Sequence, residues 1–126
     1  AADLNPARLT LLAGGGDRLD HTLAALGALA RPSLTAVPHL EAWWGRQRIR
    51  VVHGPGRARL VDLPIGATLS LLAIGGPCTG VTSTGVRWTL TDFTLDPLTG
   101  RGISNEVTEP DVTVACSSGV LLVFHP

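Results

Sequence analysis

The first 37 residues combine a short apolar run with a helical pattern. Residues 8–13, Arg-Leu-Thr-Leu-Leu-Ala, are followed at once by three glycines at 14–16, as at the end of a buried strand. Asp17 is a candidate cap for the helical segment that comes next, and Pro32 cannot continue that helix. Apolar residues recur on one face of this helix at Leu19, Leu23, Leu26 and Ala30. With a further short strand over 34–37, the pattern predicts a βαβ unit of a parallel sheet.

The remaining residues have a β pattern. A short helix is predicted over 38–44, and residues 46–52 then alternate charged and branched side chains, as in a half-exposed strand. Beyond them, Gly, Pro, Asp and Thr separate short β-rich runs that have no helical periodicity between them. The runs are 58–62, 68–74, 79–84, 86–90, 111–116 and 119–124. Their number and spacing predict an antiparallel β-sandwich or barrel.

The composition changes near residues 53–56, where the short β-rich runs begin, and this change predicts a domain boundary. We therefore expect an α+β protein, in which residues 1–55 form a partial α/β (βαβ) segment and residues 56–126 form an antiparallel β-sandwich. A parallel sheet normally contains more strands than the two predicted here. The α/β part is therefore expected to be incomplete.

The composition excludes several classes of protein. Of the 126 residues, 44% are hydrophobic and 16% are charged, which supplies a core and argues against intrinsic disorder. Ten basic residues, all arginine, balance ten acidic residues, so there is no basic excess for nonspecific nucleic-acid binding. No apolar run approaches the roughly 18 to 20 residues that span a bilayer, so we expect no membrane partner.

Cys78 and Cys116 are the two cysteines of the chain. Two are too few for a disulfide scaffold or a cysteine-based zinc site, so we expect free, buried thiols in a protein of the reducing cytoplasm. A disulfide between them stays open as the alternative.

The glycine-rich turn before the predicted helix is the first candidate for chemistry. Backbone N–H groups of such a turn can approach a phosphate, and Arg18 can add a forked contact to it. The turn lacks the Lys-Ser/Thr of a P-loop. The alternative is purely structural: Asp17 caps the helix, and Asp20 complements the helix dipole.

The second candidate is the run 82–90 together with the loop 102–106, which contains Ser104 and Asn105. If residues 86–90 alternate as a strand, Trp88 shares a face with its apolar neighbours. The residues alone favour a core role for Trp88, because a buried Trp stabilises a small sandwich strongly. The loop alone is explained by local backbone hydrogen bonds.

Both candidates resemble one family in the same order along the chain. Residues 15–24 resemble the Gly-Arg-Leu-Asp-His-Thr-Leu-Ala segment of bacterial thiamine pyrophosphokinases, except that Asp17 is inserted before Arg18. Residues 82–90, 102–106 and 118–123 resemble the Gly-x-x-Trp/Tyr-x-Leu, Ser-Asn-Glu and terminal Gly-x-Leu-Leu motifs of the thiamine-binding β domain of that family. The resemblance covers nearly the whole chain.

The resemblance also implies that the chain is the carboxy-terminal portion of such an enzyme. Family members carry an acidic Gly-Asp-x-Asp-Ser type motif, associated with Mg²⁺ and ATP, upstream of the Arg-Leu-Asp-His segment. No such motif occurs in this sequence. Residues 1–55 would then be the end of an α/β catalytic domain, and residues 56–126 the thiamine-binding β-sandwich domain.

The activity implied by the resemblance is transfer of pyrophosphate from ATP to the hydroxyl of thiamine, giving thiamine pyrophosphate and AMP. It implies Mg²⁺ as cofactor, ATP as co-substrate, and a homodimer with its sites at the interface. The implied roles are catalysis by Asp20 and Arg18, metal binding by Asp20, phosphate binding by Gly15, Gly16 and Arg18, and thiamine binding by Trp88, Ser104 and Asn105. Without the upstream acidic motif, we expect this chain alone to be inactive.

A noncatalytic β-sandwich module that binds a ligand or mediates dimerisation is the alternative. The missing acidic motif favours this noncatalytic alternative if the 126 residues act on their own. A longer gene product that supplies the missing strands and acids would favour the enzyme.

Overall fold

The computed structural model describes residues 6–13 and 18–126, so Gly15, Gly16 and the predicted cap Asp17 lie outside the described residues. The strands are β1 (Arg8–Ala13), β2 (His39–Trp44), β3 (Gln47–His53), β4 (Gly56–Leu60), β5 (Thr68–Thr84), β6 (Phe93–Leu95), β7 (Asn105–Glu106), β8 (Val112–Cys116) and β9 (Ser118–His125). The helical elements are α1 (Leu19–Ala28) and the 3₁₀ turns η2 (Pro32–Leu34) and η3 (Gly100–Gly102).

The amino-terminal part forms a βαβ arrangement, as predicted, but its second strand lies later in the chain. Strand β1 pairs in parallel with β2, from Arg8 opposite His39 onwards. The strand predicted at 34–37 is wrong, because these residues form part of η2 and a turn. The helix predicted at 38–44 is also wrong, because Leu40 and Ala42 alternate into the core as β2.

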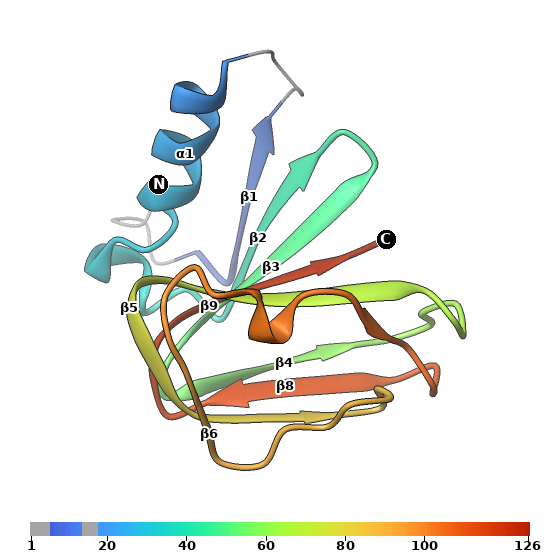
Figure 1. Ribbon diagram of the computed structural model, residues 1–126. Coiled ribbons are helices and arrows are strands. Elements are labelled where there is room, and N and C mark those ends of the chain that lie inside the picture. The colour runs from blue at the N-terminus through green and yellow to red at the C-terminus, as the bar shows by residue number, and fades with distance from the viewer. Residues whose placement is uncertain (1–5, 14–17) are drawn as a thin grey trace.

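The strands belong to one curled sheet in which β5 joins two layers (Figure 1). The order along the sheet is β1-β2-β3-β9-β5-β8-β4, and β6 and β7 both pair with β5. The first half of β5 pairs with β9, whereas residues 82–84 pair with β8. The predicted strands 68–74 and 79–84 are therefore one strand with an irregularity between Ile74 and Thr79.

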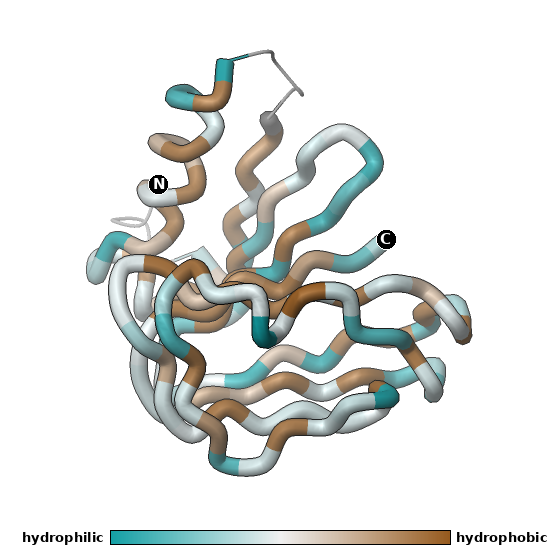
Figure 2. Tube along the Cα trace, in the orientation of Figure 1, coloured by the Kyte–Doolittle hydropathy of each residue, from teal (hydrophilic) through white to brown (hydrophobic). Residues whose placement is uncertain are grey.

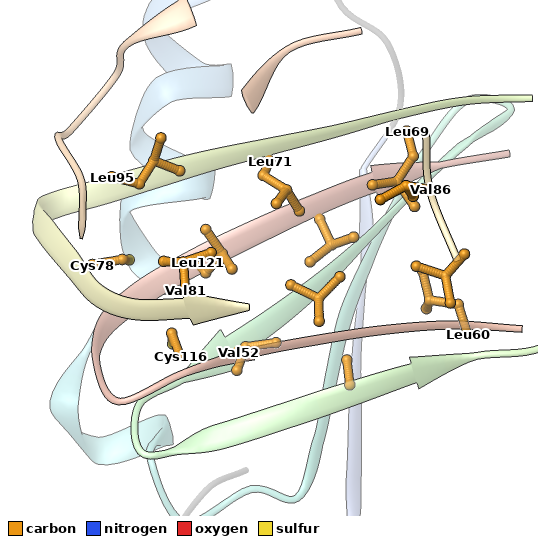
Figure 3. Close-up of a cluster of buried hydrophobic side chains, with 14 of the residues drawn as sticks. Val52, Leu60, Leu69, Leu71, Cys78, Val81, Val86, Leu95, Cys116 and Leu121 are labelled. Atoms are coloured by element: carbon orange, nitrogen blue, oxygen red, sulfur yellow. The ribbon is translucent and has the colours of Figure 1, made fainter. Parts of the chain in front are cut away.

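Strand β9 separates two hydrophobic cores. Leu121 and Val123 point into the larger core, between the layers of the curled sheet, and Figure 3 shows this cluster. Leu122 points to the opposite face, into a smaller core that also contains Leu29 and Leu40. Hydrophobic positions recur along the strands of the sheet, whereas the β3 side of the β2–β3 hairpin is hydrophilic close to its turn (Figure 2).

Helix α1 lies beside β1 and contributes no buried residue of its own (Figure 1). Its side chains Leu19 and Leu23 are 69% and 55% exposed. The first side chain that is fully covered comes directly after the helix, at Leu29. The apolar stripe therefore predicted the helix correctly, but only the carboxy-terminal end of the stripe packs against described residues.

The predicted division between residues 55 and 56 stays a prediction about domain organisation. The sheet itself continues across it, because β3 pairs with β2 on one edge and with β9 on the other. Cys78 and Cys116 are free and buried, as predicted. No helix within 6–13 and 18–126 has the length and apolar character needed to cross a bilayer.

Candidate functional site

A pocket of about 320 Å³ brings together the three residues of the predicted thiamine set. Trp88 enters it from the loop after β5, Ser104 from the segment that joins η3 to β7, and Asn105 from the first position of β7. The remaining lining residues are Leu71, Leu90, Arg101, Gly102 and Ile103. Segments far apart in the chain are thus brought to one site by the pairing of Val86 with Val107.

Trp88 lies on the surface and not in the core. Its exposed fraction is 55%, so the core role that the residue pattern favoured is wrong. The predicted strand 86–90 is also wrong, because Val86 makes a single bridge to Val107 and residues 87 and 88 then form a bend. The guanidinium carbon of Arg87 lies 4.8 Å from the centre of the Trp88 ring.

Asn105 fixes the position of Trp88 by holding both polar atoms of its backbone. The Trp88 N–H donates to Asn105 Oδ1 over 3.1 Å, and Asn105 Nδ2 donates to the Trp88 carbonyl oxygen over 2.9 Å. Oδ1 also accepts from the Glu106 N–H over 2.8 Å. A side-chain amide has two acceptor sites and two N–H donors, so one N–H of Asn105 stays available to a ligand.

The backbone beneath the pocket is shaped by two further residues that were not among the predicted site residues, Ser70 and Gly102. Ser104 has φ +63°, a left-handed conformation, and its N–H donates to Ser70 Oγ over 3.0 Å. A Cβ on Gly102 would lie 2.6 Å from the carbonyl oxygen of Leu71, so only glycine fits there. Gly102 belongs to the Gly-Ile-Ser-Asn-Glu motif, so its spacing was available as a signal, whereas Ser70 had none.

Among the described residues that line this pocket, Arg101 is the one that carries a charge, and none is a carboxylate. Arg101 lies over Phe93, with its guanidinium carbon 5.1 Å from the ring centre. An aromatic face with a hydroxyl, one amide N–H and no acid suits a flat, neutral heteroaromatic ring. It is less suited to a cationic ring.

Arg18 and Asp20 form a separate ion pair at the start of α1. Arg18 Nη2 lies 2.6 Å from Asp20 Oδ2, and Arg18 Nε donates to Oδ1 over 3.2 Å. The Arg18 guanidinium lowers the pKa of Asp20, and the backbone N–H of His21 lowers it further. Asp20 is thus an exposed, ionised carboxylate. Neither residue lines the pocket of Trp88.

The described residues contain no group of three or more His, Cys, Asp or Glu that could hold a metal ion. Asp20 can supply one oxygen ligand, which agrees with the usual binding of Mg²⁺ through one or two carboxylates and substrate phosphates. Both Asp20 oxygens now accept hydrogen bonds from Arg18, so this guanidinium would have to move first.

Residues 48–121 match the family model described as thiamin pyrophosphokinase, vitamin B1 binding domain. The chain belongs to this family. The matched range contains Trp88, Ser104 and Asn105, whereas Arg18 and Asp20 lie outside it.

Solved thiamine pyrophosphokinases have the same fold. The enzyme of Bacillus subtilis is 19% identical over 98% of this chain and 57% of its own, with a TM-score of 0.83. A family protein of Enterococcus faecalis is 22% identical over 92% of this chain and 54% of its own, with a TM-score of 0.75. The enzyme of Candida albicans is 16% identical over 94% of this chain and 44% of its own, with a TM-score of 0.74.

This chain therefore spans little more than half the length of the bacterial proteins. A search of curated proteins found no match.

Proposed function

We propose that this chain supplies the thiamine-binding part of a thiamine pyrophosphokinase. Such an enzyme transfers a pyrophosphoryl group from ATP to the hydroxyl of thiamine and forms thiamine pyrophosphate and AMP. The observation that carries the proposal is the family match over 48–121, within which Trp88, Ser104 and Asn105 line one pocket.

The chemistry of the pocket supports one orientation of thiamine. Trp88 presents an exposed ring face for stacking, and the Ser104 hydroxyl and the remaining Asn105 N–H provide hydrogen bonds to a ring nitrogen or amine. Arg101 is the charged residue among the described lining residues, and its positive charge repels a cationic ring. The neutral aminopyrimidine therefore enters the pocket, and the cationic thiazolium points outward. Carboxylates that face the thiazolium would then belong to another part of the enzyme.

In this proposal, Arg18 and Asp20 bind the phosphates of ATP and the Mg²⁺ ion. The Arg18 guanidinium would bind ATP oxygens and offset the negative charge that develops on them, together with Gly15 and Gly16. Mg²⁺, when bound, would neutralise the phosphates, and Asp20 would give it one ligand. In a homodimer, the pocket of Trp88 would meet Asp20 of the partner subunit, which would complete the site at the interface.

Thiamine titration by calorimetry tests the proposed pocket. We expect Trp88→Ala to weaken thiamine binding by about 0.5 to 2 kcal/mol, because one stacking contact is lost, and Trp88→Phe to weaken it less. Leu98→Ala is the matched control, since Leu98 is also exposed but does not line the pocket. Equal thiamine affinity in the parent and all three variants would exclude Trp88 from the site.

A coupled assay for AMP release separates the enzyme from the noncatalytic alternative. We expect no useful turnover from the 126-residue chain and turnover from a longer protein that adds the acidic motif. Asp20→Asn in that longer protein should reduce turnover by orders of magnitude without unfolding it, because Asn cannot neutralise a metal ion. Turnover that Asp20→Asn does not change would contradict the role of Asp20.

A further inference from the structure

A larger pocket, of about 680 Å³, lies on the face of the sheet that α1 does not cover. Leu40 and Ala42 point to the α1 side, so the alternating residues His39, Glu41 and Trp43 point into this pocket. The end of β4 and the segment 61–64 that follows it also line the pocket. Figure 1 shows β2 and β3 extending away from the layer that contains β4. This pocket shares no lining residue with the pocket of Trp88 among the described residues.

The pocket is strongly basic, although the chain as a whole carries a formal charge of zero. Two carboxylates, Glu41 and Asp62, line it beside five arginines. The arginines are Arg8, Arg46, Arg48, Arg50 and Arg59. Half of the arginines of the chain thus gather in one cavity.

Two of these arginines already have carboxylate partners. Arg8 Nη2 lies 3.0 Å from Glu41 Oε1, and Arg59 Nη2 lies 2.7 Å from Asp111 Oδ2. Within 6–13 and 18–126, no ion pair involves the other three, Arg46, Arg48 and Arg50. These three guanidinium groups provide donors that described carboxylates do not occupy.

Glu41 is the nearest candidate to neutralise Arg50, but its oxygens are engaged elsewhere. Oε1 accepts from Arg8 and from Thr10 over 3.0 Å, and Oε2 lies 3.2 Å from His39 Nε2. Burial lowers the pKa of Arg50, the charge of Glu41 raises it, and the nearby charge of Arg8 lowers it again. A half-buried cation with a second cation beside it and no direct counterion among the described residues is stabilised by an anion from solution.

Arg48 is held in place beside Arg50. Its guanidinium carbon lies 4.1 Å from the centre of the Trp43 ring, and this stacking fixes a side chain that would otherwise be mobile. Both arginines stand on β3 two residues apart, so their side chains leave the same face of the strand. The result is a pair of neighbouring forked donors that both line the pocket.

We propose that this pocket binds a small molecule that carries two or more linked phosphates. Forked guanidinium groups match phosphate oxygens, and three arginines without described carboxylate partners suit several negative charges better than one. A cavity of about 680 Å³ is large enough for a phosphate chain and an attached nucleoside. The same chemistry fits an inorganic oligophosphate or a nucleotide, and the test distinguishes the two.

Calorimetric titration with inorganic triphosphate, and with ATP in the absence of Mg²⁺, tests the proposal. We expect saturable binding of triphosphate that weakens as salt is added, because the contacts are ionic. Arg48→Gln and Arg50→Gln should each lower the affinity by about tenfold, the effect of losing one charged hydrogen bond. Arg46→Gln, in the turn before β3, provides a further variant that leaves the strand unchanged.

Arg57→Gln is the matched control, because it removes the same charge from an exposed arginine outside this pocket. ATP binding tighter than triphosphate would assign a nucleotide, and equal affinities would assign the phosphate chain alone; both results support the proposal. The absence of saturable binding would overturn it. So would an Arg57→Gln effect as large as those of Arg48→Gln and Arg50→Gln, or binding that the three pocket variants leave unchanged in folded protein.

Discussion

At the scale of single residues, Asn105 serves the candidate thiamine site mainly by positioning Trp88. Both polar atoms of the Trp88 backbone are bonded to its side chain, and Oδ1 in addition accepts the Glu106 N–H. Trp88 itself is exposed, so the packing of its ring does little to fix it. The orientation of the stacking face therefore depends on an amide group 17 residues away.

We predict that Asn105→Ala destabilises the protein by about 1 to 3 kcal/mol and also weakens thiamine binding. The stability loss follows because the variant removes three hydrogen bonds and leaves backbone groups without partners. Ser104→Ala is the control, because Ser104 lines the same pocket but is held through its backbone N–H. Urea unfolding should separate the two variants, and thiamine titration of Asn105→Ala checks the loss of binding. A Ser104→Ala protein as unstable as Asn105→Ala would contradict the positioning role.

The surroundings of Glu41 shift the pKa of its carboxyl group. Its burial opposes ionisation, but hydrogen bonds from His39, Thr10 and Arg8, with a smaller contribution from Trp43, lower its pKa to about 2. The indole N–H of Trp43 contributes without making a hydrogen bond of standard geometry within the described residues. An ionised carboxylate is therefore kept inside the basic pocket.

We predict that Glu41 makes stability depend on pH between about 4.5 and 2. Its pKa in the folded protein is lower than its usual value of 4.5, so its contribution is complete above pH 4.5 and is lost as the pH falls toward 2. The difference corresponds to about 3 kcal/mol. Glu41→Gln should be less stable than the parent at pH 7 and equal to it near pH 2, in urea unfolding at a series of pH values. An unchanged pH profile in Glu41→Gln, or the same change in the exposed Glu109→Gln, would contradict this assignment.

At the scale of elements, short alternating or apolar runs predicted several of the strands. Residues 46–52, 58–62, 111–116 and 119–124 correspond to β3, β4, β8 and β9. The prediction of a helix at 38–44 failed because the adjacent Trp43 and Trp44 hide a period of two, in which Trp44 packs against the smaller core and Trp43 faces the basic pocket. Two apolar neighbours on opposite faces of a strand resemble one face of a helix when only the sequence is read.

The candidate site was partly predictable from the sequence, but its geometry was not. The motif at 102–106 identified Ser104 and Asn105, whereas local alternation placed Trp88 in a strand and in the core. That assignment failed because the bridge between Val86 and Val107 ends the pairing after one residue. A long-range contact of this kind leaves no local periodicity. The hydrogen bonds of Asn105 are equally long-range.

We predict that two glycines with similar backbone conformations respond very differently to alanine. Gly75 has φ +78°, and a Cβ added there would have no described atom within 4 Å, whereas at Gly119, with φ +89°, a Cβ would lie 2.5 Å from the Pro77 carbonyl oxygen. Gly75→Ala should cost about 1 to 2 kcal/mol through its backbone conformation alone. Gly119→Ala should cost several kcal/mol, because β9 must also move away from β5. Thermal or urea unfolding of both variants checks the order, and equal losses would contradict it.

At the scale of the whole molecule, the two cores depend on each other through β9 and β5. In β9, Leu121 belongs to the larger core and Leu122 to the smaller one, and β5 is similarly shared through Leu71 and Leu72. A strand paired on both edges and buried on both faces cannot open without disturbing each layer. In contrast, β1 lies at one end of the strand order, and α1 buries none of its own side chains.

This difference predicts a gradient of stability from β9 to α1 that amide hydrogen exchange can measure. In β9, the amides should exchange only through global unfolding, because Leu121, Leu122 and Val123 are all fully buried. In α1, the amides should exchange through local opening, since none of the side chains of the helix is fully buried and only Leu26 packs partly against the smaller core. We expect the protection of α1 to be at least about tenfold lower than that of β9, which corresponds to about 1.4 kcal/mol or more between local and global opening. Equal protection, falling in parallel as urea is added, would show instead that α1 unfolds only together with the sheet and that both cores form one cooperative unit.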